Sequence, residues 1–153
     1  MKKILLLNMV CFSLFGCDSN KVTKEYLVGE WDCVNKEYES KYDPKSAGFS
    51  KYTELYSNHV IRSYKIVNEV LLTKIIDEDE DEDEEKLDLD EFYKNLEVKD
   101  KIEDCEYTIT RSLLKNSSNK FTFEIEMIVN CSEKDNPINK FKVKRKAICT
   151  RIK

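Results

Sequence analysis

The sequence predicts a mainly β protein: an antiparallel meander of about seven strands that forms a small disulfide-stapled barrel or sandwich, with one or two short helices. Two observations support this prediction. Apolar and polar residues alternate along several segments between residues 30 and 152, which is typical of strands with one buried face. The 153 residues include six Cys but only three Gly and two Pro, and 41% are apolar, which suffices for the core of one domain.

Seven segments are expected to form strands. They cover residues 30–38, 49–56, 59–67, 70–76, 105–113, 121–131 and 140–152. Short polar stretches lie between many of them, as is usual for the turns of a meander. We expect such breaks at residues 57–58, 68–69 and 116–119.

Two short helices accompany the strands. Residues 21–28 are expected to form a helical turn with Thr23 as a possible cap. In residues 89–96 the apolar side chains follow the i, i+3, i+4, i+7 spacing of one helix face. Asp88 precedes this segment and Glu91 lies in its first turn. The spacing of these two residues resembles a capping pair.

The first sixteen residues have the composition of a removable export signal. Two lysines follow Met1, and a twelve-residue apolar run comes next. A membrane-spanning helix needs about 20 residues, so this run has the length of a signal-peptide core. It ends in Leu14-Phe15-Gly16-Cys17, which resembles the lipobox of bacterial lipoproteins. The resemblance implies cleavage before Cys17, a lipid on its sulfur, acylation of its amine and attachment to a membrane.

The same resemblance implies a place in the cell envelope, with the domain facing the periplasm. Asp18 after the lipidated position resembles the inner-membrane retention signal of enteric lipoproteins, and the outer membrane remains the alternative. We therefore divide the chain into a signal peptide (1–16), a lipidated tether (17–22) and a single β domain (23–153) with an acidic insertion at 77–87.

Four cysteines remain for the exported domain, because Cys11 leaves with the signal and Cys17 carries the lipid. They are Cys33, Cys105, Cys131 and Cys149. An even number in an exported chain implies two disulfides, for which three connectivities exist. Reduced thiols or a metal site are the alternative, although the spacing contains no CxxC pair that would favour zinc.

The register of one hairpin selects among the connectivities. If the strands pair about Ser118, then Leu113 faces Phe123 and Cys105 faces Cys131 on the same side of the sheet. A one-residue slip would put the two sulfurs on opposite faces. Directly opposed residues of antiparallel strands have Cα atoms about 4.5–5.5 Å apart, which a disulfide can bridge. We therefore predict a Cys105–Cys131 disulfide.

The second disulfide follows from the last strand. That strand should return along residues 121–131, which brings Cys131 close to residue 140 and far from Cys149. Cys149 is then left for Cys33 on the first strand. Such a bond requires the first and last strands to be neighbours, as they are in a closed or nearly closed sheet.

Gly29 and Trp31 open the first expected strand as a Gly-x-Trp motif, which resembles the first strand of lipocalin-like barrels. The resemblance implies that a basic residue from the last strand covers the Trp ring. Arg151 or Arg145 could supply that cation–π contact. Because small barrels are normally filled by their own side chains, we expect Trp31 to be a core residue.

The acidic insertion is the most distinctive local feature. Residues 77–85 are all Asp or Glu, whereas the rest of the mature chain has a small excess of Lys and Arg. The alternating Asp77, Asp79 and Asp81 invite a calcium-loop hypothesis, but Glu82 stands where such a loop requires Gly. We therefore expect a solvated, self-repelling loop or a docking arm for a cationic partner, and no dedicated metal site.

Catalytic chemistry has little support in the sequence. His59 is the single histidine, and three glycines leave no room for a Walker loop or a dinucleotide fingerprint. We expect no enzyme activity, no cofactor and no nucleic-acid partner. The last strand is rich in lysine, and its charge is expected to protect a sheet edge, to face a membrane or to meet the acidic insertion.

The sequence therefore favours a membrane-anchored, noncatalytic protein-binding module, for example a periplasmic inhibitor or immunity protein. Its expected partner has a basic surface, since tyrosines are favourable interface residues and the insertion is acidic. The candidate contact residues are Asp77, Glu78, Asp79, Glu80, Asp81, Tyr42 and Tyr52. The alternative is a lipocalin-like carrier of a small apolar ligand, which an internal cavity of roughly several hundred Å³ would favour and a core filled by side chains would exclude.

Overall fold

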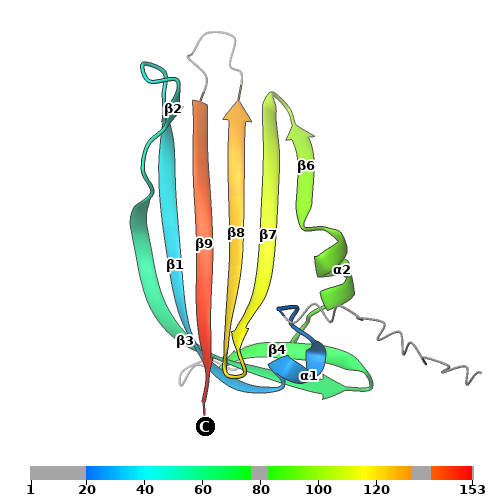
Figure 1. The fold of residues 1–153 in the computed structure, drawn as a ribbon. Helices are drawn as coiled ribbons and strands as arrows, with labels where there is room; N and C mark the ends of the chain where they lie inside the picture. The colour runs from blue at the N-terminus through cyan, green and yellow to red at the C-terminus, as the bar shows by residue number, and fades with distance from the viewer. Residues whose placement is uncertain (1–19, 77–82, 132–138, 153) are drawn as a thin grey trace, which may run out of the picture.

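A computed structural model describes residues 20–76, 83–131 and 139–152 and shows one curled antiparallel sheet with two short helices at one end (Figure 1). The helices are α1 (Lys24–Leu27) and α2 (Leu89–Lys94). The strands are β1 (Gly29–Asp43), β2 (Gly48–Phe49), β3 (Thr53–Val67), β4 (Val70–Ile76), β5 (Glu85–Lys86), β6 (Glu97–Ile102), β7 (Cys105–Ser117), β8 (Lys120–Cys131) and β9 (Asn139–Arg151).

The sheet consists of two meanders joined through the first and last long strands. Its order is β5-β4-β3-β1-β9-β8-β7-β6, and β2 pairs with the end of β1. The expected mainly β, barrel-like fold is confirmed. The sheet curls into a half-barrel that leaves β5 and β6 as edges, so β1 and β9 meet in its middle rather than by closing a barrel.

One predicted strand boundary was wrong, and one strand was not predicted. Ser57 and Asn58 were expected to break the chain, but they lie inside the continuous strand β3 and pair with β1. Strand β6 was not predicted, because its alternation of Val98 and Ile102 is short and is interrupted by charged residues. The strand expected over 70–76 is β4, and the turn before it contains Asn68 and Glu69 with φ of 50° and 68°.

Both predicted disulfides are present. Cys33 is the direct partner of Cys149 across β1 and β9, and Cys105 is that of Cys131 across β7 and β8. The Cα atoms are 4.0 Å apart in each pair. The β7–β8 register also pairs Leu113 with Phe123, as the alternation predicted.

Both helices have the predicted caps and are shorter than predicted. The Thr23 hydroxyl accepts a hydrogen bond from the Tyr26 amide (3.2 Å), and the Asp88 carboxylate accepts from the amides of Asp90 and Glu91. Helix α2 ends at Lys94, so Leu96, expected on its apolar face, lies beyond the helix and is 40% exposed. In the described part of the chain, neither helix is long and apolar enough to cross a bilayer.

The hydrophobic core lies at the end of the sheet where the helices pack, which we call the basal end. Trp31 is fully buried there, and its indole N–H donates to the Leu27 carbonyl at 2.6 Å. The Arg151 guanidinium lies 4.2 Å from the Trp31 ring centre, as the Gly-x-Trp motif implied, whereas Arg145 pairs with Glu37 instead. The opposite end, around β2, is called the distal end.

Candidate functional site

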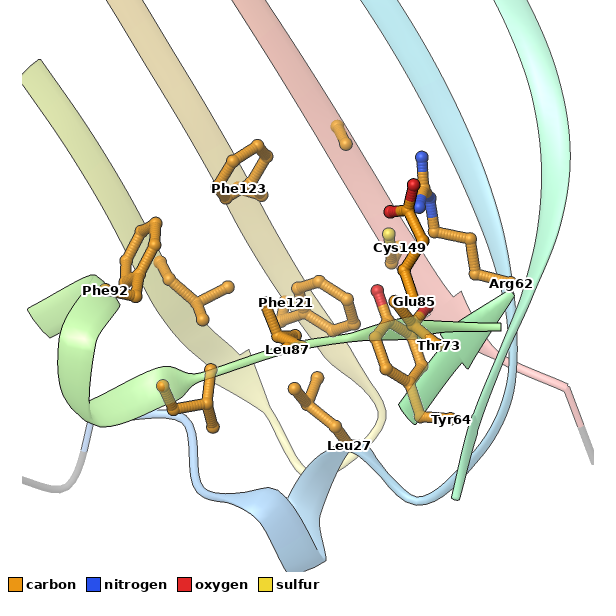
Figure 2. Close-up of a pocket in the computed structure, with 13 residues that line it drawn as sticks. Leu27, Arg62, Tyr64, Thr73, Glu85, Leu87, Phe92, Phe121, Phe123 and Cys149 are labelled. Atoms are coloured by element: carbon orange, nitrogen blue, oxygen red, sulfur yellow. The ribbon is translucent and has the colours of Figure 1, made fainter. Parts of the chain in front are cut away.

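A pocket of about 200 Å³ lies between the concave face of the sheet and α2, directly above the core. Figure 2 shows its two sides. Leu27, Leu87, Phe92, Phe121 and Phe123 form an apolar side. Tyr64, Arg62, Thr73 and Glu85 gather on the other side.

The strand register explains why this space exists. Phe121 and Phe123 project from the same face of β8 and pair with Cys149 and Ala147 of β9. Because Ala147 is small, the row that contains Phe123 leaves room on the concave face. Helix α2 supplies Phe92, whose ring centre lies 5.8 Å from that of Phe123 and so encloses the pocket from the side.

The polar side of the pocket comes from β3, β4 and β5. Thr73 is the direct partner of both Tyr64 and Glu85, so these three side chains meet on one face. Burial raises the pKa of the Tyr64 phenol further above its ordinary value. Arg62, Thr73 and Glu85 also line a second, wider hollow of about 470 Å³ that adds Lys74 and Asp83.

Arg62 lines both hollows and carries the positive charge of the polar side. It is half-buried, and none of the residues in 20–76, 83–131 or 139–152 forms an ion pair with its guanidinium within 4.0 Å. An arginine at one end of an apolar pocket provides several N–H donors for a polar ligand group.

Tyr42 and Tyr52, predicted as partner contacts, lie away from the pocket at the distal end. Both are half-buried: Tyr42 packs edge-on against Phe49, and Tyr52 packs against Tyr38 and donates a hydrogen bond to Glu126. Burial, followed by that hydrogen bond, raises the pKa of Tyr52. Much of each ring is therefore already engaged within the protein.

The lysines of the last strand do not protect an edge, because β9 lies between β1 and β8 in the middle of the sheet. Three of them cover the distal aromatic rings. Lys140 lies 5.3 Å from the Tyr42 ring centre, Lys142 4.3 Å from that of Phe49, and Lys144 5.0 Å from that of Tyr52.

All five predicted acidic contact residues lie outside the described residues: Asp77, Glu78, Asp79, Glu80 and Asp81. The end of the acidic run is described. Glu84 forms an ion pair with Lys65, and Asp83 lines the wider hollow beside the pocket. The described end of the acidic insertion therefore lies beside the polar side of the pocket.

His59 lies on the face of the sheet opposite to Trp31. Its Nδ1 is 3.5 Å from the Asp32 carboxylate, and its side chain is 70% exposed. Among the described residues, no group of three or more His, Cys, Asp or Glu side chains is arranged to hold a metal ion.

Sequence reasoning did not identify Arg62, Phe92 or Ala147 as pocket residues. The sequence could have indicated Arg62, because it occupies an inward position of the alternation that includes Val60 and Tyr64. No pattern in the sequence could have indicated Ala147, since its role depends on its partner Phe123 in β8. Comparisons with protein-family models, curated proteins and solved structures found no match to this chain.

Proposed function

We propose that this protein is a lipid-anchored, noncatalytic binding module of the cell envelope that takes a small, mainly apolar ligand into the pocket above its core. One observation carries the proposal: the pocket combines an apolar wall with a small group of polar side chains that includes Arg62 and Glu85. Sites with many apolar groups and a few convergent polar groups are typical of small-molecule binding.

The size of the pocket limits the ligand. Drug-sized ligands occupy pockets of roughly 300–1,000 Å³, whereas this pocket measures about 200 Å³. A short acyl chain or one or two fused rings would fit. The polar group of the ligand would lie at the side of Arg62 and Glu85, where both signs of charge are available.

The anchor and the compartment rest on two observations. The residues before Cys17 form the lipobox-like motif. Two cross-strand disulfides, Cys33–Cys149 and Cys105–Cys131, are of the kind that persists in oxidising compartments such as the periplasm. Mass spectrometry of the protein purified from the envelope would test the anchor directly, through the mass added at Cys17.

A space-filling substitution would test the pocket. Ala147→Leu adds three carbons inside it, and Val143→Leu, which adds one carbon on the same face of β9 outside the lining, is the control. We expect Ala147→Leu to weaken the binding of short fatty acids such as octanoate at least tenfold, as measured by isothermal titration calorimetry. Equal binding by wild type and Ala147→Leu would contradict the proposed site.

A protein partner is the second candidate. It is favoured by apolar exposure away from the pocket: Leu55 and Tyr56 are each 56% exposed where β3 bulges against β1. The acidic insertion would steer a basic partner, such as a toxin or hydrolase that the protein neutralises. Changing residues 77–85 to Ser and Gly should then abolish capture of that partner, and moderate salt should have the same effect.

A further inference from the structure

Four chain segments lie together at the basal end, opposite to the distal end around β2 (Figure 1). Tyr26 of α1 donates its hydroxyl hydrogen to the Ser117 carbonyl (2.9 Å) in the β7–β8 turn. Lys24 reaches the Glu69 carbonyl (3.2 Å) in the β3–β4 turn. The Arg151 amide donates to the Asn119 carbonyl at 2.9 Å. We call residues 21–28, 66–70, 114–120 and 151–152 the basal surface.

The basal surface carries exposed apolar side chains from each of its four segments. Five large ones, each between 39% and 48% exposed, belong to it: Val28, Ile66, Val67, Leu114 and Ile152. Single exposed apolar residues need no explanation, but a group on one end of a small domain marks an interaction surface.

The charges of the basal surface are mainly positive. Lys21, Lys24, Lys115 and Lys120 lie on it, against the carboxylates of Glu25 and Glu69. Two of these lysines lie over tyrosine rings: Lys21 is 4.5 Å from the ring centre of Tyr93 and Lys115 is 4.8 Å from that of Tyr26. Lysine and tyrosine side chains beside exposed apolar groups are the combination found at membrane–water interfaces.

The chain enters the domain at this same surface. The Asn20 carbonyl accepts a hydrogen bond from the Lys115 amide at 2.8 Å, and Lys21 pairs with Leu114. Cys17 precedes Asn20 by three residues, and three residues span at most about 11 Å. That reach is close to the Debye length of about 8 Å at physiological ionic strength. A lipid on Cys17 would therefore hold the basal lysines within range of lipid headgroups.

We propose that the basal surface rests on a bilayer that contains anionic phospholipids, so that the half-barrel stands with its distal end away from the membrane. This orientation rests on the lipid anchor of the proposed function. It adds a second membrane contact, made by the folded domain itself: the five apolar side chains enter the headgroup region, and the four lysines lie beside lipid phosphates.

Hydrogen–deuterium exchange of the full lipidated protein in vesicles tests the orientation. The amides of residues 23–28, 66–70 and 114–120 should exchange more slowly in phosphatidylglycerol–phosphatidylethanolamine vesicles than in phosphatidylcholine vesicles. The distal turn at residues 44–47 should exchange equally in both. Equal exchange of the basal segments in the two lipids, or protection of the distal turn instead, would overturn the proposal.

The lipid-free chain separates this surface from the anchor. Because the core cluster runs from Val22 to Cys149, a chain that begins at Asp18 contains all of it. It should sediment with phosphatidylglycerol vesicles at low salt and be released as salt rises, and absence of sedimentation would refute the surface. An unmodified Cys17 in the native protein would refute the anchor alone.

A matched pair of variants assigns the lysines. Neutralising the four basal lysines (Lys21→Gln, Lys24→Gln, Lys115→Gln, Lys120→Gln) should weaken vesicle binding of the lipid-free chain at least tenfold. Neutralising four lysines elsewhere (Lys45→Gln, Lys51→Gln, Lys99→Gln, Lys101→Gln) removes the same charge and should change it less than twofold. Equal losses in the two variants would show general charge attraction and would contradict the assigned surface.

Discussion

The two disulfides have the same cross-strand geometry but lie in different surroundings. Cys33 and Cys149 are at most 1% exposed and belong to the core cluster at the basal end, whereas Cys105 and Cys131 are half-buried near the distal end. The first bond joins the two meanders and the second joins neighbouring strands of one hairpin. The comparison indicates that the basal end is stabilised by packing and cross-linking together, and the distal end mainly by the strand ladder.

Removing each disulfide in turn should have the largest effect. The bonds close loops of 116 and 26 residues, and chain entropy predicts losses of about 5 and about 3.5 kcal/mol respectively. Cys33→Ala/Cys149→Ala also removes sulfurs from the core, so its loss should be greater than the loop term alone. Urea unfolding of both double variants measures the difference, and equal losses would contradict the comparison.

Truncating the same side chain at the two ends should have the next largest effect. Phe121 is 2% exposed at the basal end, and Phe141 of β9 is half-buried at the distal end. Phe121→Ala should cost about 3–5 kcal/mol, which is usual for a core Phe. Phe141→Ala should cost about half as much, because solvent already reaches its ring. Guanidinium unfolding measures both values, and a larger loss from Phe141→Ala would indicate a second core at the distal end.

Alkaline pH should lower the free energy of unfolding, partly through Tyr64 at the basal end. Its folded-state pKa is raised, first by burial, so above pH 10 the unfolded chain loses its phenolic proton while the folded chain keeps it. The contribution of Tyr64 to the free energy of unfolding is therefore fully present below pH 10 and falls as the pH rises beyond it. Tyr64→Phe should make the stability curve flatter between pH 9 and 11, as thermal unfolding would show. An unchanged slope would show that Tyr64 ionises normally in the folded protein.

The sequence predicted the local pairings of the fold better than the pocket. The alternation on either side of Ser118 contained the β7–β8 register, because a one-residue slip would have separated Cys105 from Cys131. The continuity of β3 could not be inferred, since Ser57 and Asn58 resemble a turn until β1 pairs with them. The edge strand β6 escaped because charged side chains interrupt its short apolar alternation.

The pocket could not be predicted from the sequence for a different reason. It depends on Ala147 standing opposite Phe123 and on Phe92 reaching across from α2, and neither relation is local in sequence. A sequence pattern identifies inward-facing residues, but it does not show which inward residue is too small to fill its row. Binding space in a half-barrel is therefore a property of strand partners rather than of motifs.

The helix caps should have the smallest effect and would refine the comparison, because α2 closes the pocket between the two ends. The Asp88 carboxylate accepts hydrogen bonds from the amides of Glu91 and Asp90 (3.0 and 3.1 Å), and these bonds lower its pKa. A lowered pKa adds stability above the unfolded value near 3.9 that is lost as the pH falls through the folded value. Asp88→Asn keeps an oxygen acceptor but loses the charge. The Tm of this variant should therefore lie slightly below that of wild type at pH 7, and the difference in Tm should be smaller at pH 3. A difference that persists at pH 3 would mean that the geometry of the cap, and not its charge, holds α2 over the pocket.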